Sequence, residues 1–139
     1  MIVRSAAMAL LVTVIFGCGS GPTYKGPQRF PLSGKVTLDG TPIDGGTISF
    51  IPTVKGNPAG GPIVNGTYTV SEEQGANEGS HRVEIRWLKP TGEKVKDDDT
   101  GEMIDVVKEV VPVKFNTNSE LKAEIKSDKK EFDFSLVTK

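Results

Sequence analysis

The sequence is short of the residues on which disulfide-linked domains, metal sites and most enzymes depend. Its 139 residues include one cysteine, Cys18, and one histidine, His81. A lone cysteine cannot form a disulfide within the chain, and a lone histidine has no second imidazole with which to bind a metal or a substrate. The glycine pairs are not followed by a helical pattern that could bind a phosphate. We therefore expect no catalytic residue, no metal and no small-molecule cofactor.

An excess of positive charge and a long apolar run are also missing. The chain carries 17 basic and 18 acidic residues, a formal net charge of −1, so no positive field would gather a nucleic acid. The apolar run at 6–16, interrupted only by Thr13, covers 11 residues, whereas a transmembrane helix needs about 20. The sequence thus argues against a nucleic-acid partner and against a transmembrane anchor at this run.

What the first 18 residues do contain is the layout of a secretory signal. Arg4 precedes the apolar run, and small Gly17 precedes Cys18. The segment Ile15-Phe16-Gly17-Cys18 resembles the lipobox of bacterial lipoproteins, in which an aliphatic, a variable and a small residue stand before the cysteine. The resemblance implies that Cys18 receives a diacylglycerol, that the chain is cut before it, and that the acyl chains hold the protein at a membrane. Two acyl chains anchor a protein stably, whereas one does so only marginally.

The alternative is an ordinary secretory signal with an incidental cysteine near the cut. An unpaired thiol is unusual in an exported protein unless it is consumed, which favours lipidation. Gly19 is not an aspartate, which favours the outer membrane, with the domain facing the periplasm or the cell exterior. The predicted organisation is a signal peptide at 1–17, a lipidated cysteine with a flexible Gly- and Pro-rich tether at 18–30, and one domain at 31–139.

From Pro31 onward, short runs alternate apolar and polar residues. The alternation predicts strands at 35–38, 47–52, 67–70, 81–88, 121–126 and 131–136, with turns at Asp39-Gly40 and Asn65-Gly66. The stretch 104–113 is ambiguous, because its valines would suit a helix face, but four valines and Pro112 favour an extended segment or a sheet edge. Each run has one apolar face, so we expect antiparallel strands in two sheets packed face to face.

Several segments, in order, resemble the carboxypeptidase regulatory-like domain. They are residues 34–50, Gly66-Thr67-Tyr68-Thr69-Val70, Gly79-Ser80-His81-Arg82-Val83-Glu84-Ile85, Pro112-Val113-Lys114-Phe115-Asn116, Ser119-Glu120-Leu121 and Phe132-Asp133-Phe134-Ser135-Leu136. The tail segments are similar to those of small bacterial lipoproteins with this domain. The resemblance covers about residues 31–137. It implies an all-β, transthyretin-like (prealbumin-like) fold, an antiparallel Greek-key β-sandwich of about seven strands. In carboxypeptidases the domain accompanies a separate catalytic domain, for which this chain has no room.

Three side chains or groups could still carry chemistry. An acidic cluster offers Asp97, Asp99 and Glu102 as candidate calcium ligands, but their spacing does not follow an EF-hand loop, and a solvated loop is favoured. His81 and Trp87 share the apolar face of their strand, so both are predicted to be structural rather than catalytic or sugar-binding.

The expected function is that of a non-enzymatic lipoprotein of the cell envelope that displays a binding or structural module. The loops at 53–61, 71–79 and 89–105 are the expected contact surfaces for envelope proteins or glycans. The alternative is a carbohydrate-binding or cell-adhesion module, which an exposed pair of Trp or Tyr side chains would support.

Overall fold

The computed structural model describes residues 25–139. The signal peptide, the lipobox residues Ile15, Phe16 and Gly17, the lipidation site Cys18 and most of the tether lie outside the described residues. What the sequence indicates for them therefore stays a prediction.

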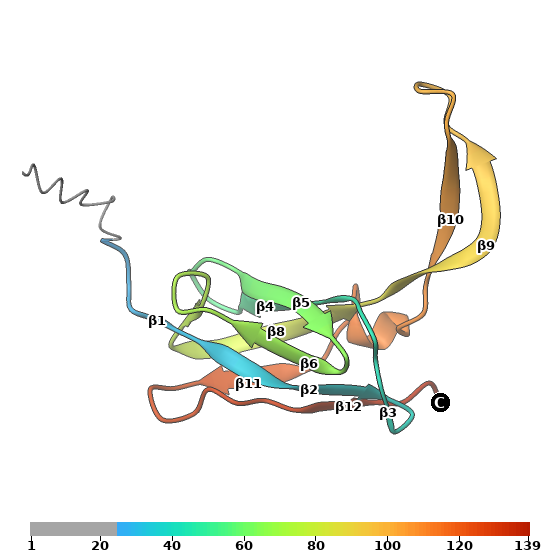
Figure 1. Ribbon diagram of the computed structural model, residues 1–139. Helices are drawn as coiled ribbons and strands as arrows, with labels where there is room; N and C mark the ends of the chain where they lie inside the picture. Colours follow the sequence, from blue (N-terminus) through green and yellow to red (C-terminus); the bar gives the residue numbers. More distant parts are fainter. Residues whose placement is uncertain (1–24) are drawn as a thin grey trace, which may run out of the picture.

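One curled sheet forms the body of the protein (Figure 1). Its strands follow the order β11-β8-β4-β5-β6-β2-β12, and β3 pairs with β2 outside this path. The strands of the body are β2 (Leu32–Leu38), β3 (Thr41–Pro42), β4 (Thr47–Pro52), β5 (Ala59–Val64), β6 (Thr67–Val70), β8 (Gly79–Arg86), β11 (Lys122–Ile125) and β12 (Phe134–Leu136). The predicted all-β class is confirmed.

The sheet changes direction at β5. Residues 59–62 of this strand pair with β4, whereas Ile63 and Val64 pair with β6. Gly60 allows the close approach to β4, because a Cβ atom there would lie 2.2 Å from the carbonyl oxygen of Ile48. The sheet therefore folds over on itself as a half-barrel. The expected Greek-key sandwich is not confirmed, because ladder pairing continues from β11 to β12 without a break.

The pairing of β12 with β2 also differs from the expected antiparallel arrangement. Phe134 lies beside Val36 and Leu136 beside Leu38, with the two strands parallel. The carboxylate of Asp39, just after β2, accepts hydrogen bonds from the backbone N–H (3.0 Å) and the hydroxyl (2.8 Å) of Thr138. These bonds hold the pKa of Asp39 below its ordinary value. The end of the chain is thus tied to the turn that follows β2, a contact no local pattern predicts.

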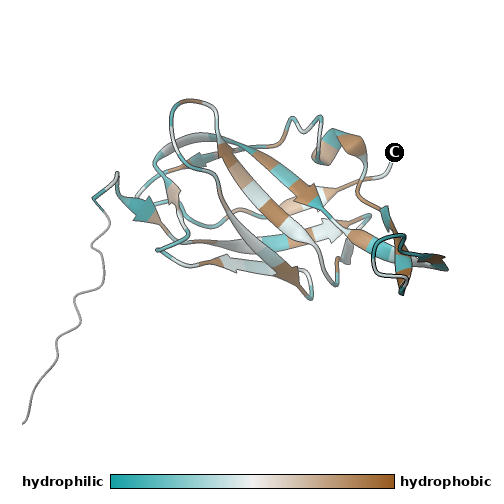
Figure 2. Cartoon of the chain, turned by 90° about the horizontal axis from the view of Figure 1, so that it is seen from above, coloured by the Kyte–Doolittle hydropathy of each residue, from teal (hydrophilic) through white to brown (hydrophobic). Residues whose placement is uncertain are grey.

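The apolar faces of the strands meet inside the curl. Figure 2 shows hydropathy alternating along the strands, and the burial follows it. The largest side chains of the core that are fully buried are Phe50, Leu32, Ile43, Ile48, Ile63, Ile85, Ile125, Leu136, Val36, Val70 and Val83. Every residue of this core lies between Phe30 and Leu136. All of these core residues lie within the described part of the chain, so we expect residues 25–139 to fold on their own.

Both predicted turns are confirmed. Asp39 and Gly40 have φ values of 50° and 81°, and Asn65 and Gly66 have 50° and 74°. Two successive residues with positive φ are typical of the type I′ turn, whose twist matches that of the flanking strands. These turns set the register of β2 with β3 and of β5 with β6.

Two short elements close the ends of the curl. At one end β1 (Arg29–Phe30) pairs with β7 (Ala76–Asn77), and Phe30 and Ala76 are buried there. Near the other end lies a 3₁₀ turn, η1 (Val113–Phe115).

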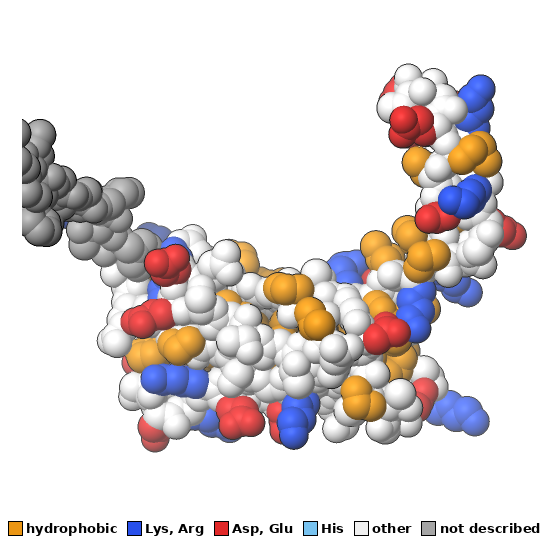
Figure 3. Space-filling model, viewed as in Figure 1, with side chains coloured by type: hydrophobic (Ala, Val, Ile, Leu, Met, Phe, Trp, Pro, Cys, Tyr) orange, Lys and Arg blue, Asp and Glu red, His pale blue; other side chains and the backbone are white. Residues whose placement is uncertain are grey.

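A two-stranded arm projects from the body (Figures 1 and 3). Its strands are β9 (Leu88–Lys96) and β10 (Met103–Glu109), paired antiparallel with a bulge opposite the step from Asp105 to Val107. Residues 89–105, expected to be a loop, instead form most of this hairpin. The extended conformation favoured for the ambiguous stretch is confirmed at 104–109.

A buried tyrosine connects the two halves of the curl. The ring of Tyr68 lies 5.8 Å from that of Phe50, and its hydroxyl donates a hydrogen bond of 2.7 Å to the carbonyl oxygen of Phe132. A Cβ atom at Gly34 would lie 1.9 Å from the same oxygen, so the strands meet closely there. Burial, followed by the negative charges of Asp133 and Glu131, raises the pKa of Tyr68 well above its ordinary value. The hydroxyl therefore stays protonated and donates.

Replacing this donor tests the contact. We expect Tyr68→Phe to lower the free energy of unfolding by about 1–2 kcal/mol, because the buried carbonyl of Phe132 loses its side-chain partner. Urea unfolding of residues 19–139 measures the change. Thr69→Val, on the exposed face of the same strand, is the control and is expected to change stability by less than about 0.5 kcal/mol. Equal midpoints for Tyr68→Phe and the wild type would contradict the assignment.

Candidate functional site

The three loops predicted as contact surfaces do not gather in one place. Residues 53–58, the part of the first predicted loop that precedes β5, and residues 71–79, which include β7, meet at the end of the body where the described chain begins. They share a hollow of about 400 Å³ lined by Pro27, Lys55, Gly56, Asn57 and Asn77. The third segment, 89–105, forms the arm at the opposite end (Figure 1). The structure therefore offers two separate surfaces at the ends of the body.

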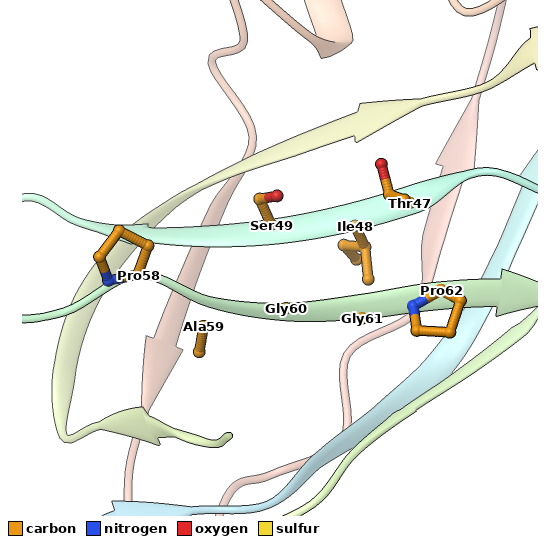
Figure 4. A pocket seen from close by; sticks show the side chains of 8 residues that line it. All are labelled: Thr47, Ile48, Ser49, Pro58, Ala59, Gly60, Gly61 and Pro62. Atoms are coloured by element: carbon orange, nitrogen blue, oxygen red, sulfur yellow. The ribbon is translucent and has the colours of Figure 1, made fainter.

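A second hollow runs along the outside of β4 and β5. It has a volume of about 470 Å³ and is lined by Thr47, Ile48, Ser49, Pro58, Ala59, Gly60, Gly61 and Pro62. Figure 4 shows Thr47 and Ser49 on the opposite side of β4 from Ile48, and a bare backbone at the two glycines. Two hydroxyls and no aromatic or charged side chain line it. This hollow lacks the convergent polar groups that fix a small ligand.

Beside this hollow, the outer face of β8 carries a short ladder of charges. Glu84 lies between two arginines, with its oxygens 2.7 Å from Arg82 and 3.6 Å from Arg86. Arg86 also donates a hydrogen bond of 3.3 Å to the hydroxyl of Thr117. The carboxylate and both guanidinium groups therefore have partners within the protein, and the ladder is an exposed ion-pair network of modest energetic value.

Aromatic side chains do not form a sugar-binding platform in the part of the chain that is described. Tyr68 is buried, and Trp87 is partly buried against the core. The ammonium group of Lys89 lies over the Trp87 ring, 3.8 Å from the ring centroid. The exposed aromatic pair that would favour carbohydrate binding is therefore not found among residues 25–139.

The single histidine lies inside the core. His81 is buried on β8, where its Nδ1 is 3.0 Å from the carbonyl oxygen of Gly79, and its Nε2 has no hydrogen-bond partner. Glu84 follows it with the His-x-x-Glu spacing of many zinc sites, but residues three apart on a strand point to opposite faces. His81 points inward and Glu84 points outward to the two arginines. The pair cannot bind one metal ion in this conformation.

The acidic cluster forms the tip of the arm. Oδ1 of Asp97 accepts hydrogen bonds from the backbone N–H of Asp99 (3.0 Å) and Thr100 (2.7 Å) and from the hydroxyl of Thr100 (2.9 Å). The bonds from Thr100 lower the pKa of Asp97 below its ordinary value. Asp97, Asp99 and Glu102 do not form a metal-binding group, and none was found elsewhere among the described residues. Asp97 is thus a turn-capping residue.

The arm exposes more large apolar side chains than any other element described. Leu88 and Met103 are 58% exposed, and Val107 is 50% exposed. Val95 and Ile104, opposite each other in the register, are 48% and 45% exposed. Cross-strand partners share a face, so the register places Val95 and Ile104 on one face and Met103 and Val107 on the other. Both faces of the arm are therefore partly apolar and open to solvent.

The base of the arm is held in a fixed direction. One carboxylate oxygen of Glu109 accepts hydrogen bonds from the backbone N–H of Trp87 (2.8 Å) and of Val111 (3.0 Å). The N–H of Val110 donates to the carbonyl oxygen of Trp87 at 3.0 Å. Because Trp87 packs on the core, these bonds connect the arm to the body.

The sequence did not reveal the arm as a hairpin. Apolar residues lie on both of its faces, so the strands lack the one-sided alternation that predicts a half-buried sheet. A usable signal was the turn: Asp97-Asp98-Asp99-Thr100-Gly101 separates two extended stretches, and Gly101 has a φ of 74°. A hairpin at this position is consistent with that signal.

Comparison with family models, with curated proteins and with solved structures found no match to the chain. Within residues 25–139 no helix is long and apolar enough to cross a membrane. The function must therefore be argued from the residues themselves, and the arm is the strongest candidate for a functional surface.

The structural role of His81 can be tested by removing its polar atoms. We expect His81→Leu to keep the stability of the wild type within about 1 kcal/mol or to raise it, because the substitution removes a buried nitrogen without a partner. Val83→Ala, two residues along the same buried face, is the matched control and should lower the free energy of unfolding by about 1–3 kcal/mol. Thermal and urea unfolding measure both. A loss for His81→Leu as large as that of Val83→Ala would show that the imidazole contributes more than packing.

Because Asp97 caps the turn at the tip of the arm as a carboxylate, we expect the stability of this turn to depend on pH. The lowered pKa of Asp97 means that its contribution is present above the pKa of the unfolded chain and is lost as the pH falls through the lower folded-state pKa. We expect Asp97→Ala to increase amide hydrogen exchange at Asp99 and Thr100 at neutral pH. Asp98→Ala, next to it, should leave these amides unchanged. Similar exchange in the two variants would contradict the capping role.

Proposed function

We propose that the chain is a lipid-anchored, non-enzymatic protein of a bacterial cell envelope that presents its β-rich body and projecting arm as a binding module. The observation that carries this proposal is the arm itself, a fixed hairpin that exposes apolar side chains on both faces. Exposed apolar side chains gathered on one element are typical of sites where proteins bind one another.

The anchor is supported by the order of features in the first 18 residues. A basic residue, an apolar run of 11 residues and Ile15-Phe16-Gly17-Cys18 follow one another as in lipoproteins. Two acyl chains on Cys18 would hold the protein at the membrane, with a slight preference for the outer membrane from Gly19.

The geometry of the body fits this role. The described chain begins beside β1 at one end of the body, and the arm projects from the other end (Figure 1). A tether that enters beside β1 would leave the arm at the end away from the point of attachment. The arm would then be free to meet a partner.

A binding role is also supported by the surroundings of the titratable groups. His81 is buried without a second reactive group, Glu84 is paired with two arginines, and Asp97 caps a turn. Among the described residues these groups are engaged in structure rather than gathered around a cavity.

We also infer that the body is a transthyretin-like domain of the carboxypeptidase regulatory-like kind. The supporting segments fall on consecutive parts of the curl: residues 34–38 on β2, 67–70 on β6, 79–85 on β8 and 134–136 on β12. The two halves of the sheet face each other across Phe50 much as the layers of a sandwich do. A Greek-key arrangement of two sheets is part of this proposal.

Replacing the acylated residue tests the anchor. We expect Cys18→Ala to move the protein from the membrane fraction to the soluble fraction and to remove the acyl mass from the intact protein, because no thiol remains to be modified. Ser20→Ala is the matched control and should leave both unchanged. Intact mass spectrometry of the wild type that shows an unmodified thiol would overturn the proposal.

A further inference from the structure

The two faces of the arm differ in how their charges are paired. The first face, named here the inner face, carries the cross-strand pairs Lys89–Lys108 and Val95–Ile104. Strand alternation places Val106 on the same face and, beyond the last pair of the register, Glu102 and Asp97. Glu93 lies in the bulge, outside the register. On the opposite face, Lys94 and Asp105 are cross-strand partners joined by an ion pair of 3.1 Å. The opposite face thus has an internally matched pair of charges in its middle.

The inner face has like charges opposite each other at both of its ends. At the base, Lys89 is the cross-strand partner of Lys108. At the tip, the N–H of Asp97 donates to the carbonyl oxygen of Glu102 at 2.8 Å, which brings these two acidic residues side by side. Like charges in such positions destabilise a pair of strands. The isolated arm therefore has a positive base and a negative tip on the same face.

Only one of the two lysines at the base has partners among the described residues. Lys89 lies over Trp87 and is 3.8 Å from a carboxylate oxygen of Asp44. Lys108 has no ion pair with any residue in the range 25–139. Between base and tip lie Val106, Ile104 and Val95, which are partly or half exposed. An isolated two-stranded ribbon is only marginally stable in water, so a covered inner face would stabilise the arm.

We propose that a second copy of this chain covers the inner face, with the two arms antiparallel about a two-fold axis. The order along β10 is acidic Glu102, apolar Ile104, apolar Val106 and basic Lys108, with one residue of the opposite face between each. When β10 of one copy faces β10 of the other in the opposite direction, Glu102 of each copy lies over Lys108 of the other. Ile104 of each copy then lies over Val106 of the other. The surface is therefore self-complementary in both charge and hydropathy, as a two-fold interface requires.

The charge order also argues against other occupants. A membrane of anionic lipids would repel the acidic tip, which includes Asp97, Asp98, Asp99 and Glu102. The proposal rests on the binding role proposed for the arm and names its partner, but it does not need the lipid, because it concerns residues 19–139 alone. Anchoring of neighbouring copies to one membrane would only raise their effective concentration.

Charge exchange tests the arrangement. Residues 19–139, which include every core residue of the described chain, are studied by sedimentation equilibrium as the wild type and as the variants Glu102→Lys and Lys108→Glu. Since one face of a small hairpin buries limited area, we expect a dimer with a dissociation constant on the order of tens of micromolar. Each variant alone places like charges over each other and should weaken association about tenfold. An equimolar mixture of the two restores both contacts and should form a heterodimer of about wild-type affinity.

The apolar centre has a matched pair of variants. Ile104→Asp lies on the inner face and should abolish the dimer, whereas Val107→Asp, equally exposed on the opposite face, should leave it unchanged. Circular dichroism confirms that each variant keeps its β content. A wild type that stays monomeric up to about 1 mM would overturn the proposal. So would a mixture that does not associate, or equal effects of the two aspartates. None of these results bears on the membrane release of Cys18→Ala, so the two proposals fail separately.

Discussion

Phe50 is the side chain around which the body is built. It is fully buried on β4, and its ring meets three aromatic rings from the other half of the curl, those of Tyr68, Phe132 and Phe134, at centroid distances of 5.8 to 6.4 Å. Burying a phenylalanine stabilises a fold by about 1.5–3 kcal/mol, but only if strands on both sides supply apolar cover. The sheet must therefore bend between β4 and β6. That requirement explains the change of partner within β5 and the close backbone approach at Gly60.

The strands of the body bury their apolar faces against one another, so none of these faces covers the arm. β8 ends at Arg86 and β9 begins at Leu88. Trp87, between them, packs on the core but is only partly buried. Beyond that point no layer of the body lies over either face of the hairpin. The bonds of Glu109 to the backbone at Trp87 and Val111 fix where the arm leaves the body, yet they bury none of its apolar side chains. The exposure of the arm is thus a consequence of how the core is completed.

Whether a strand has a buried face also decides how well the sequence predicts that strand. Where one face of a strand is buried, apolar and polar residues alternate, so the sequence predicts the strands around Ile48, Val83 and Ala123. The dipeptides Asp39-Gly40 and Asn65-Gly66 predict the two turns. The parallel pairing of β12 with β2 is accompanied by the bond from Thr138 to Asp39, residues 99 positions apart, and nothing in either short stretch signals it. The arm has no buried face, so its alternation carries no one-sided pattern. The acidic tip could be recognised by charge, but the capping role of Asp97 needed the turn geometry.

An exposed hairpin with unmatched charges is costly unless it is occupied. Unpaired strand edges and apolar faces favour indiscriminate association, and natural proteins usually protect such edges with charge. On the arm the charges are ordered. On one face Lys94 and Asp105 form an ion pair, whereas the other face is positive at its base and negative at its tip. A pattern that only protected the arm would not need two lysines, Lys89 and Lys108, opposite each other at its base. A pattern that selects one reversed neighbour does need them, because the same charges that repel within one arm attract between two. In the proposed dimer, the repulsion within one arm and the attraction between two arms therefore come from the same charges.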